Sequence, residues 1–317
     1  MADNMSSQLG DRVKQLGHPD ETGKKLGEEG NPKPPEKHPK PVLNPVPRGT
    51  AHAGDENKGL DTGPRPTPHK IEPSTPTRTA GIDVSQYQSN IDWNGVQKAG
   101  VKFAFIRATV GSTEVDTKFS TNWQNAEKAG VLVGPYHYFT TTSPVSTQVD
   151  NFVATMGKVD KGNLPPVLDV EDPKQFANLS ADQSVALIQQ WLDGVQAKLG
   201  VRPMLYMSSA FSGDVLGDAP QLDKYKLWVA DWTTKPTPIV DNPPWADWTF
   251  WQHANNGRVG GITGDVDLDY FNGSPAQLDD VVQAAAAAAP PDAQPKDPPP
   301  PVVQPPDVQP PAAPPHN

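Results

Sequence analysis

The aromatic residues of this chain all lie in its middle, between Tyr87 and Phe271. Of the 38 prolines, by contrast, 13 fall in residues 1–79 and 13 in residues 290–317. Bulky apolar side chains supply most of the surface that a core can bury, so the flanks cannot offset the entropy cost of being ordered. The sequence therefore predicts one folded domain over 80–273, although a length of 317 residues would by itself suggest two.

Both flanks have the composition of an extended, solvated chain. Residues 1–79 are rich in Pro, Lys, Glu and Gly and are predicted to be a disordered tether. A short docking helix around Ser6–Leu26 is the alternative. Residues 274–317 are predicted to begin with an alanine-rich helix over 275–289 and to continue as a proline-rich disordered tail.

Charge and composition exclude several functional classes. Residues 80–274 carry 14 basic and 21 acidic side chains, which argues against a nucleic-acid groove as the main function. The chain has no cysteine, so disulfides, thiolate nucleophiles and cysteine-ligated zinc are excluded. We expect no membrane span, and no classical signal peptide within Met1–Gly30, because no apolar run is long enough for either.

Short apolar segments alternate with amphipathic stretches in the middle of the chain. Strands are predicted over 81–84, 103–109, 132–139, 166–170, 202–207, 227–230 and 249–252. Helices are predicted over 93–100, 116–130, 144–157 and 180–199. This alternation implies parallel strands in an α/β fold, either a (β/α) barrel or a doubly wound sheet. The barrel is favoured because no glycine-rich nucleotide fingerprint follows the first strand.

Acidic residues close several of the predicted strands, at the end where barrel enzymes hold their active sites. The candidates are Asp83, Asp169, Glu171, Asp231 and Asp267. Asp169 and Glu171 are the most informative pair, because residues two apart on a strand point to the same face with Cα atoms roughly 6.5 Å apart. Repulsion and partial burial would leave one carboxyl protonated beside an ionised partner, as glycoside hydrolysis requires.

The same acidic pair also fits three arrangements without catalysis. A calcium site, a solvated strand end, and ion pairing with Arg107 or Lys174 would each place carboxylates here. Metal binding is weakened by the apolar Val170 and by the lack of an EF-type loop. We expect neither a metal nor a cofactor.

Aromatic residues at or near the predicted strand ends favour a sugar-binding cleft, because flat apolar rings stack on sugars. They are Tyr87, Tyr136, Tyr138, Trp228, Trp232 and Trp251. For each ring taken singly, core packing is the better interpretation, and their clustering near the carboxylates is what indicates a cleft. His137 is predicted to be a packed strand residue and His253 to line the rim. No serine elbow supports a serine hydrolase and no paired histidine motif supports zinc.

Seven segments occur in an order that resembles a known family. They are Gly-Ile-Asp-Val-Ser-Gln-Tyr-Gln at 81–88, Phe-Ala-Phe-Ile-Arg-Ala-Thr at 103–109, Gly-Pro-Tyr-His-Tyr-Phe at 134–139, Leu-Asp-Val-Glu at 168–171, Trp-Val-Ala-Asp-Trp at 228–232, Trp-Gln at 251–252 and Val-Asp-Leu-Asp at 266–269. Together they resemble the family 25 glycoside hydrolases, the N-acetylmuramidase type of lysozyme, over about 81–273. The resemblance implies an irregular (β/α) barrel of the five-plus-three kind. It also implies cleavage of the β-1,4 bond between N-acetylmuramic acid and N-acetylglucosamine in peptidoglycan.

The resemblance also implies roles for single residues. Glu171 would be the general acid and then the base, Asp169 would attack the sugar or orient its N-acetyl group, and Asp83 and Asp267 would complete the acidic cluster. The expected substrate-binding residues are Tyr87, Tyr136, Tyr138, Trp228, Asp231 and Trp251. The sequence departs from the usual family pattern at Tyr87, where Trp is common, at Val110, where an acidic residue is common, and at Asp269, where Asn is common.

The sequence thus predicts a retaining lysozyme whose partner is the polysaccharide peptidoglycan, acting as a monomer at the bacterial cell wall in an extracellular or periplasmic location. The delivery route stays open between a phage lysin, an exported effector and a secreted enzyme. The alternatives are a chitinase-like hydrolase, a non-catalytic peptidoglycan-binding module, and a scaffold with the barrel as its passenger.

Overall fold

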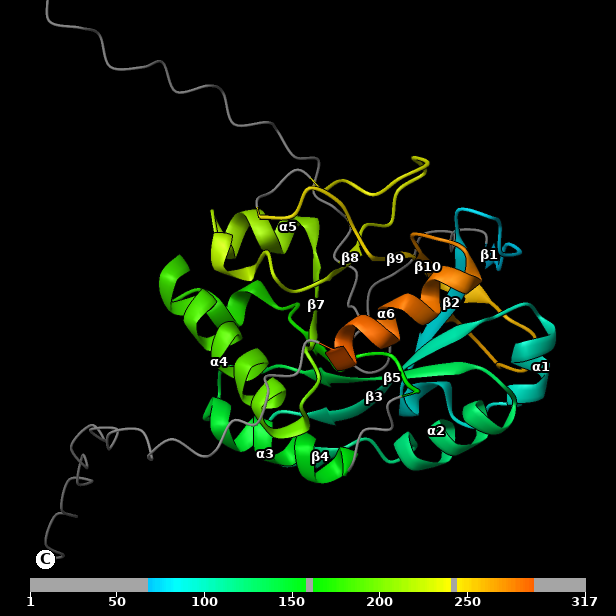
Figure 1. Cartoon of the computed structure of the whole chain (residues 1–317), viewed down its shortest axis with the longest axis horizontal. Helices are drawn as coiled ribbons and strands as arrows, with labels where there is room; N and C mark the ends of the chain where they lie inside the picture. The colour runs from blue at the N-terminus through cyan, green and yellow to red at the C-terminus, as the bar shows by residue number, and fades with distance from the viewer. Residues whose placement is uncertain (1–67, 158–161, 241–243, 288–317) are drawn as a thin grey trace, which may run out of the picture. The chain divides into compact units, whose positions relative to one another are not determined.

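Eight strands close into a barrel in the computed structural model, which describes residues 68–157, 162–240 and 244–287 (Figure 1). The barrel strands are β2 (Thr79–Val84), β3 (Phe103–Val110), β5 (Leu132–Tyr138), β6 (Val167–Asp169), β7 (Met204–Ser208), β8 (Leu227–Ala230), β9 (Phe250–Arg258) and β10 (Val266–Phe271). Neighbouring strands from β2 through β9 pair in parallel, and β10 closes the barrel by pairing antiparallel with both β9 and β2. Two short strands extend this sheet: β1 (His69–Lys70) on β9 and β4 (Glu114–Val115) on β3.

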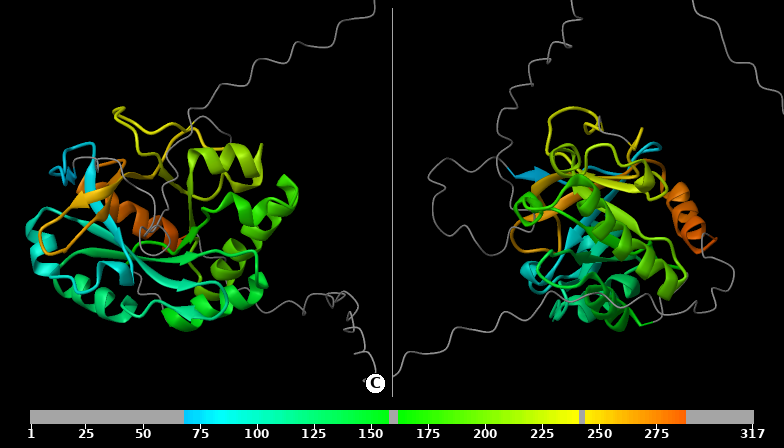
Figure 2. Two further views of the ribbon diagram at one scale, coloured as in Figure 1. Left: turned by 180° about the vertical axis from the view of Figure 1, so that it is seen from behind. Right: turned by 90° about the vertical axis from the view of Figure 1, so that its left-hand side faces the viewer.

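Helices follow each of the first five barrel strands. They are α1 (Trp93–Lys98), α2 (Phe119–Lys128), α3 (Val145–Met156), α4 (Ala181–Leu199) and the single turn α5 (Ser209–Phe211). Short turns lie at η1 (Gln86–Gln88), η2 (Pro173–Phe176), η3 (Ser212–Leu216) and η4 (Pro220–Leu222). No helix of the described ranges separates β8, β9 and β10, so the five-plus-three barrel that the sequence predicts is confirmed (Figure 2).

Local sequence explains where the longest helix begins and ends. Ser180 caps α4 because its hydroxyl accepts from the Gln183 amide (3.2 Å), while the Gln183 side chain accepts from the Ser180 amide (2.8 Å). The helix ends at Gly200, whose φ of 68° is in the left-handed region that favours glycine. Both limits agree with the predicted range of 180–199.

Apolar side chains form two cores, one on each side of the barrel wall. The outer core packs the strands against the surrounding helices, for example Ile106 of β3 and Trp191 of α4. The inner core fills one end of the barrel with large rings, including Phe103 and Phe250. The interior is so tight there that a Cβ on Gly81 would lie 2.2 Å from the Phe103 ring, which explains the glycine.

The last helix, α6 (Pro275–Ala287), closes that end of the barrel. Ser274 and Gln277 cap its start reciprocally, and Leu278, Val281 and Val282 join the inner core. The right-hand view of Figure 2 shows α6 in orange at one side of the barrel. The opposite end, where the parallel strands terminate, is left for polar groups.

Three features differ from the sequence-based picture. Strand β10 is not among the predicted strands, because its alternating acidic residues interrupt the apolar run. Strand β9 continues through the polar segment 253–258, beyond the predicted end at 252. Residues 68–79, which the sequence assigns to the tether, carry β1 and place Ile71 against the outer core. The rest of the predicted tether and the proline-rich tail lie outside the described residues.

Candidate active site

Five carboxyl groups gather inside the barrel at the end away from α6. Asp83 lies on β2, Asp169 ends β6, Glu171 follows it, and Asp267 and Asp269 lie on β10. Because β10 is antiparallel, its first residues meet the last residues of β2, and Asp267 lies directly opposite Asp83. All but Glu171 are buried, and Glu171 is partly exposed. The predicted acidic cluster is therefore brought together from three strands, with Asp269 as an added member.

Asp169 and Glu171 form a hydrogen-bonded pair. Burial raises the pKa of Asp169 well above its usual value and the charge of Asp83 adds to this, whereas the hydrogen bond with Glu171 and the charge of Arg107 lower it. Two carboxyl groups can share a hydrogen bond only when one is protonated, so the pair holds a proton. Burial is the largest of these effects, so the net shift of the Asp169 pKa is upward although the bond to Glu171 lowers it.

Tyrosines flank this pair on both neighbouring strands. The strand register aligns Tyr138 of β5 and Tyr206 of β7 with Asp169. Burial raises the pKa of both hydroxyls, and the negative charges of Glu171 and Asp169 add to the effect. Tyr136 lies two residues deeper on β5, fully buried near Asp83, Asp169 and Arg107. These phenols stay neutral and can donate to oxygen atoms at neutral pH.

Gln252 on β9 connects Asp83 to the rim of the site. Its amide nitrogen donates to Asp83 Oδ2 (2.8 Å), and its Oε1 accepts from the Tyr206 hydroxyl and from Trp232 Nε1 (3.1 Å each). Since both ends of the amide have partners of the correct kind, the side chain has one orientation. Trp232 is half-buried, at the point where β8 has ended.

Tyr87 and Arg107 form a second part of the rim. The Arg107 guanidinium lies 4.9 Å from the centre of the Tyr87 ring, and Tyr87 is 36% exposed. Arg107 Nε donates to Asp116 Oδ2 (2.9 Å), and both side chains are buried. Arg107 thus forms its ion pair with Asp116 and not with Asp169 or Glu171, which was one of the alternatives. The Arg107 charge nevertheless lowers the pKa of Asp169.

Three further residues predicted to bind substrate lie elsewhere. Trp228 is buried in the inner core, stacked on Phe105 (4.3 Å between ring centres), and its Nε1 donates to Asp269. Trp251 belongs to the outer core and contacts Arg78 and Tyr270, on the opposite face of β9 from Gln252. The carboxylate of Asp231 accepts from the Ile239 amide (2.8 Å) and so holds the loop after β8.

Two histidines near the barrel wall, His137 and His253, are structural. His137 is fully buried, stacks on Trp191 and makes hydrogen bonds to Thr109 (2.7 Å) and Gln148 (3.1 Å), as predicted for a packed strand residue. Burial lowers its pKa to about 4. His253 stacks on Tyr270 (4.1 Å), on the outer side of the barrel rather than at the rim.

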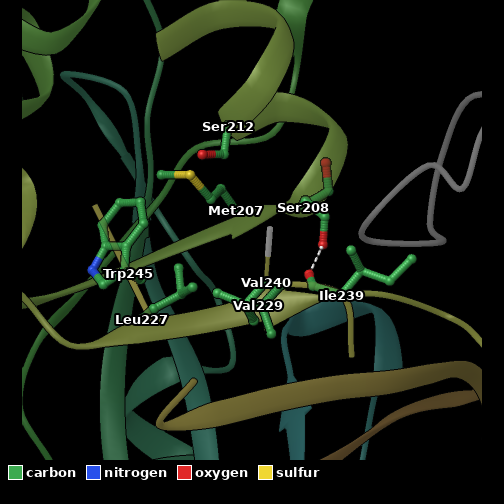
Figure 3. A pocket seen from close by; sticks show the side chains of 9 residues that line it. Met207, Ser208, Ser212, Leu227, Val229, Ile239, Val240 and Trp245 are labelled. Atoms are coloured by element: carbon green, nitrogen blue, oxygen red, sulfur yellow. Dashed lines mark hydrogen bonds between the residues drawn. The ribbon is translucent and has the colours of Figure 1, made fainter. Parts of the chain in front are cut away.

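A narrow pocket lies on the outer side of the barrel wall, between β7, β8 and the loop after β8 (Figure 3). Met207, Leu227, Val229, Val240 and Trp245 make it largely apolar. Its volume of about 10 Å³ is the size of one water molecule. The pocket is therefore too small for a sugar, and the carboxyl groups do not line it.

Sequence reasoning missed Gln252, Asp269, Tyr206 and Asp116 as site residues. A usable signal existed for Asp269, because it follows Asp267 by two residues, just as Glu171 follows Asp169. Asp116 carries no such signal, because it lies in a loop and meets Arg107 only through the fold.

Of the described helices, none is both long and apolar enough to cross a bilayer.

Comparison with known proteins agrees with this geometry. Residues 82–262 match the family described as glycosyl hydrolases family 25. Lysozyme M1 of Streptomyces globisporus is 33% identical over 250 residues, covering 74% of this chain and 84% of its own. The protein YegX of Escherichia coli K12 is 39% identical over 203 residues, covering 62% and 71% respectively.

A solved structure agrees as well. The crystal structure of the bacterial lysozyme from Streptomyces coelicolor superposes with a TM-score of 0.61 at 35% identity, covering 67% of this chain and 98% of that one. The chain therefore belongs to glycosyl hydrolases family 25 and is a glycoside hydrolase of the N-acetylmuramidase (lysozyme) type.

Proposed function

We propose that this enzyme hydrolyses the β-1,4 bond between N-acetylmuramic acid and N-acetylglucosamine in bacterial peptidoglycan, with retention of configuration. Lysozyme M1 and the autolytic lysozyme of Clostridium acetobutylicum, the latter 29% identical, support the substrate class by their names. The hydrogen-bonded Asp169–Glu171 pair is the observation that carries the mechanism. The site of action is the bacterial cell wall.

The closeness of the two carboxyl groups supports retention. An inverting enzyme keeps its carboxyl groups about 6.5–9.5 Å apart so that a water molecule fits between the sugar and the base. Two carboxyl groups in hydrogen-bond contact are closer together than that spacing. Glu171, partly exposed and hydrogen-bonded to Asp169, is suited to protonate the leaving oxygen and afterwards to activate water.

Asp169 is better suited to orient the substrate than to attack it. Burial raises its pKa, so a sizeable share of it is protonated and is not a nucleophile. We therefore propose that the N-acetyl group of the sugar attacks the anomeric carbon and that Asp169 holds this group in place. Asp83 and Asp267 tune the charge around the pair, and Tyr138 and Tyr87 contact the sugar.

Catalysis belongs to residues 80–273 in this proposal, and the flanks 1–79 and 274–317 act as tether and tail. Within the second flank, α6 also completes the barrel. The delivery route stays a prediction.

Substitution of the acid tests the assignment. We expect Glu171→Gln to lower kcat/KM on purified cell walls by about 10²–10⁴-fold, since it removes general acid–base catalysis. Glu114→Gln, at an exposed position on β4, is the matched control and should leave the rate unchanged. A folded Glu171→Gln enzyme that clears walls at the original rate would overturn the assignment.

Two further measurements test the substrate and the stereochemistry. Proton NMR of the first product should show the β-anomer, and an α-anomer would contradict retention. Release of reducing ends from peptidoglycan but not from chitin would separate the enzyme from a chitinase-like hydrolase.

A further inference from the structure

Asp269 is a buried carboxyl group without a task in the proposed catalysis. It is 1% exposed, and its Oδ1 accepts a hydrogen bond from Trp228 Nε1 (2.9 Å). Its Oδ2 is buried and accepts from no donor of the described residues. The same side chain is hydrogen-bonded to the carboxyl group of Asp83. Two ionised carboxylates buried side by side would destabilise the folded protein, so one of the two is expected to be protonated.

Hydrogen-bond partners and surroundings together favour Asp269 as the carboxyl group that carries the proton. Asp83 already accepts from Gln252 Nε2 at its Oδ2 (2.8 Å), which favours its ionised form. Trp228 occupies only Oδ1 of Asp269, which leaves Oδ2 able to carry a proton and donate it. Burial raises the pKa of Asp269 well above its usual value and the charges of Asp83 and Asp267 raise it further, which together outweigh the lowering by the Trp228 hydrogen bond.

The contact between Asp269 and Asp83 has a consequence at the rim of the site. Asp83 lies between Gln252 on one side and the carboxyl groups of Asp267 and Asp269 on the other, and it is hydrogen-bonded to all three. Gln252 in turn holds Tyr206 and Trp232 through its Oε1. A continuous hydrogen-bonded chain therefore runs from the inner core at Trp228 to Trp232 at the rim.

We propose that Asp269 is a positioning residue that, as a neutral carboxylic acid, donates from Oδ2 to Asp83 and so holds Gln252 and Trp232 in place for the sugar. The part of this proposal in which Trp232 contacts the sugar rests on the proposed function. Its structural part, a neutral Asp269 that donates to Asp83, stands apart from catalysis and can be tested apart from it.

Among the residues that the structure describes, four side chains lie around Asp269. Asp83 faces it from β2, Trp228 from β8, Gln252 from β9 by strand register, and Asp267 lies beside it on β10. Asp267 in turn feels the charges of Asp83, Glu171 and Asp265. Replacing Asp269 by Asn keeps all of these side chains in the protein and removes the proton that Asp269 can gain or lose.

Two variants distinguish a side chain at position 269 that donates a hydrogen bond from one that only fills space. Asp269→Asn keeps an oxygen for Trp228 and has an amide that donates to Asp83, so kcat/KM at pH 6 should stay within about threefold of the wild-type value. Asp269→Leu has a similar size and neither function, so kcat/KM should fall at least about tenfold, mainly through KM. Asp279→Asn, exposed on α6, is the control. Equal losses in both variants would overturn the proposal.

Unfolding at different pH values tests the proton directly and needs no activity. A group whose pKa is raised on folding stabilises the fold below its unfolded pKa, and this stability is lost as the pH rises through the folded value. The urea midpoint of the wild type should therefore decrease relative to that of Asp269→Asn between pH 5 and pH 9. A constant difference, or one of opposite sign, would show that Asp269 is ionised. An enzyme inactive on cell walls would overturn the proposed function and leave this result intact.

Discussion

Asp116 is a single side chain that holds two segments of the rim in place. Its Oδ2 accepts from Arg107 Nε on β3 and from the Gln86 amide after β2, at 2.9 Å each. Its Oδ1 accepts from the Lys118 amide (2.9 Å). Gln86 in turn accepts from the Thr117 amide and hydroxyl. The ring of Tyr87 therefore keeps its place over Arg107 because Asp116 fixes both partners.

We expect Asp116→Asn to destabilise the protein strongly, because it leaves the buried Arg107 without its counter-charge. Breaking a buried ion pair typically costs about 3–5 kcal/mol. The matched control is Asp150→Asn, which breaks the exposed Lys198–Asp150 pair, with side chains 48% and 62% exposed, and should cost less than about 1 kcal/mol. Urea unfolding measures both. Equal losses would show that Asp116 acts as an ordinary surface charge.

At the scale of elements, α6 seals one end of the barrel. Its residues Leu278, Val281 and Val282 meet Phe103, Phe250 and Phe271 at the end of the barrel opposite the carboxyl groups. Because β10 is antiparallel to its neighbours, the chain returns along it to this end of the barrel. The helix that directly follows β10 therefore packs against the inner core there. The barrel can then be polar at one end because it is sealed at the other.

Removing one apolar side chain of α6 tests this role. Leu278→Ala should lower the free energy of unfolding by about 2–5 kcal/mol, since the side chain is 3% exposed and its loss leaves a cavity. Asp280→Ala, at an exposed position of the same helix, should change it by less than about 0.5 kcal/mol. Thermal or urea unfolding distinguishes the two. If Leu278→Ala behaves like Asp280→Ala, α6 does not seal the barrel.

At the scale of the whole molecule, closing the barrel buries titratable groups of two opposite kinds. Asp169, Asp267 and Asp269 have raised pKa values because of burial, which favours the fold at low pH. His137, neutral between Thr109 and Gln148, has a pKa lowered by burial, which favours the fold at higher pH. The two effects oppose one another, so stability should be greatest in between.

The histidine effect can be isolated by substitution. The pKa of His137 is about 4 in the folded protein and near 6.5 in the unfolded chain. The contribution of neutral His137 to the free energy of unfolding is therefore complete above about pH 6.5 and is lost as the pH falls through about 4. The total loss is about 3 kcal/mol. His137→Gln cannot titrate, so the free energy of unfolding of this variant should depend less on pH between 6.5 and 4. Urea unfolding at several pH values measures this. An unchanged acid dependence would contradict the prediction.

Local patterns in the sequence determined most of the fold and the central pair of carboxyl groups, Asp169 and Glu171. The helix over 180–199 follows from a cap, an apolar stripe and a terminal glycine, all short-range features. Asp169 and Glu171 lie close together because they are two residues apart, at the end of β6 and just after it. The predicted order of strands and helices rests on the same kind of local information.

Only the tertiary structure decided which side chains meet across the barrel. Asp83 and Asp269 are far apart in sequence and become neighbours because β10 reverses direction and closes on β2. Trp251 and Gln252 differ by one residue, yet the register of β9 turns one to the outer core and the other to the carboxyl groups. Barrel closure is a long-range property, since it depends on the pairing of every strand at once, and this is why the sequence indicates the acids but only the fold assigns their partners.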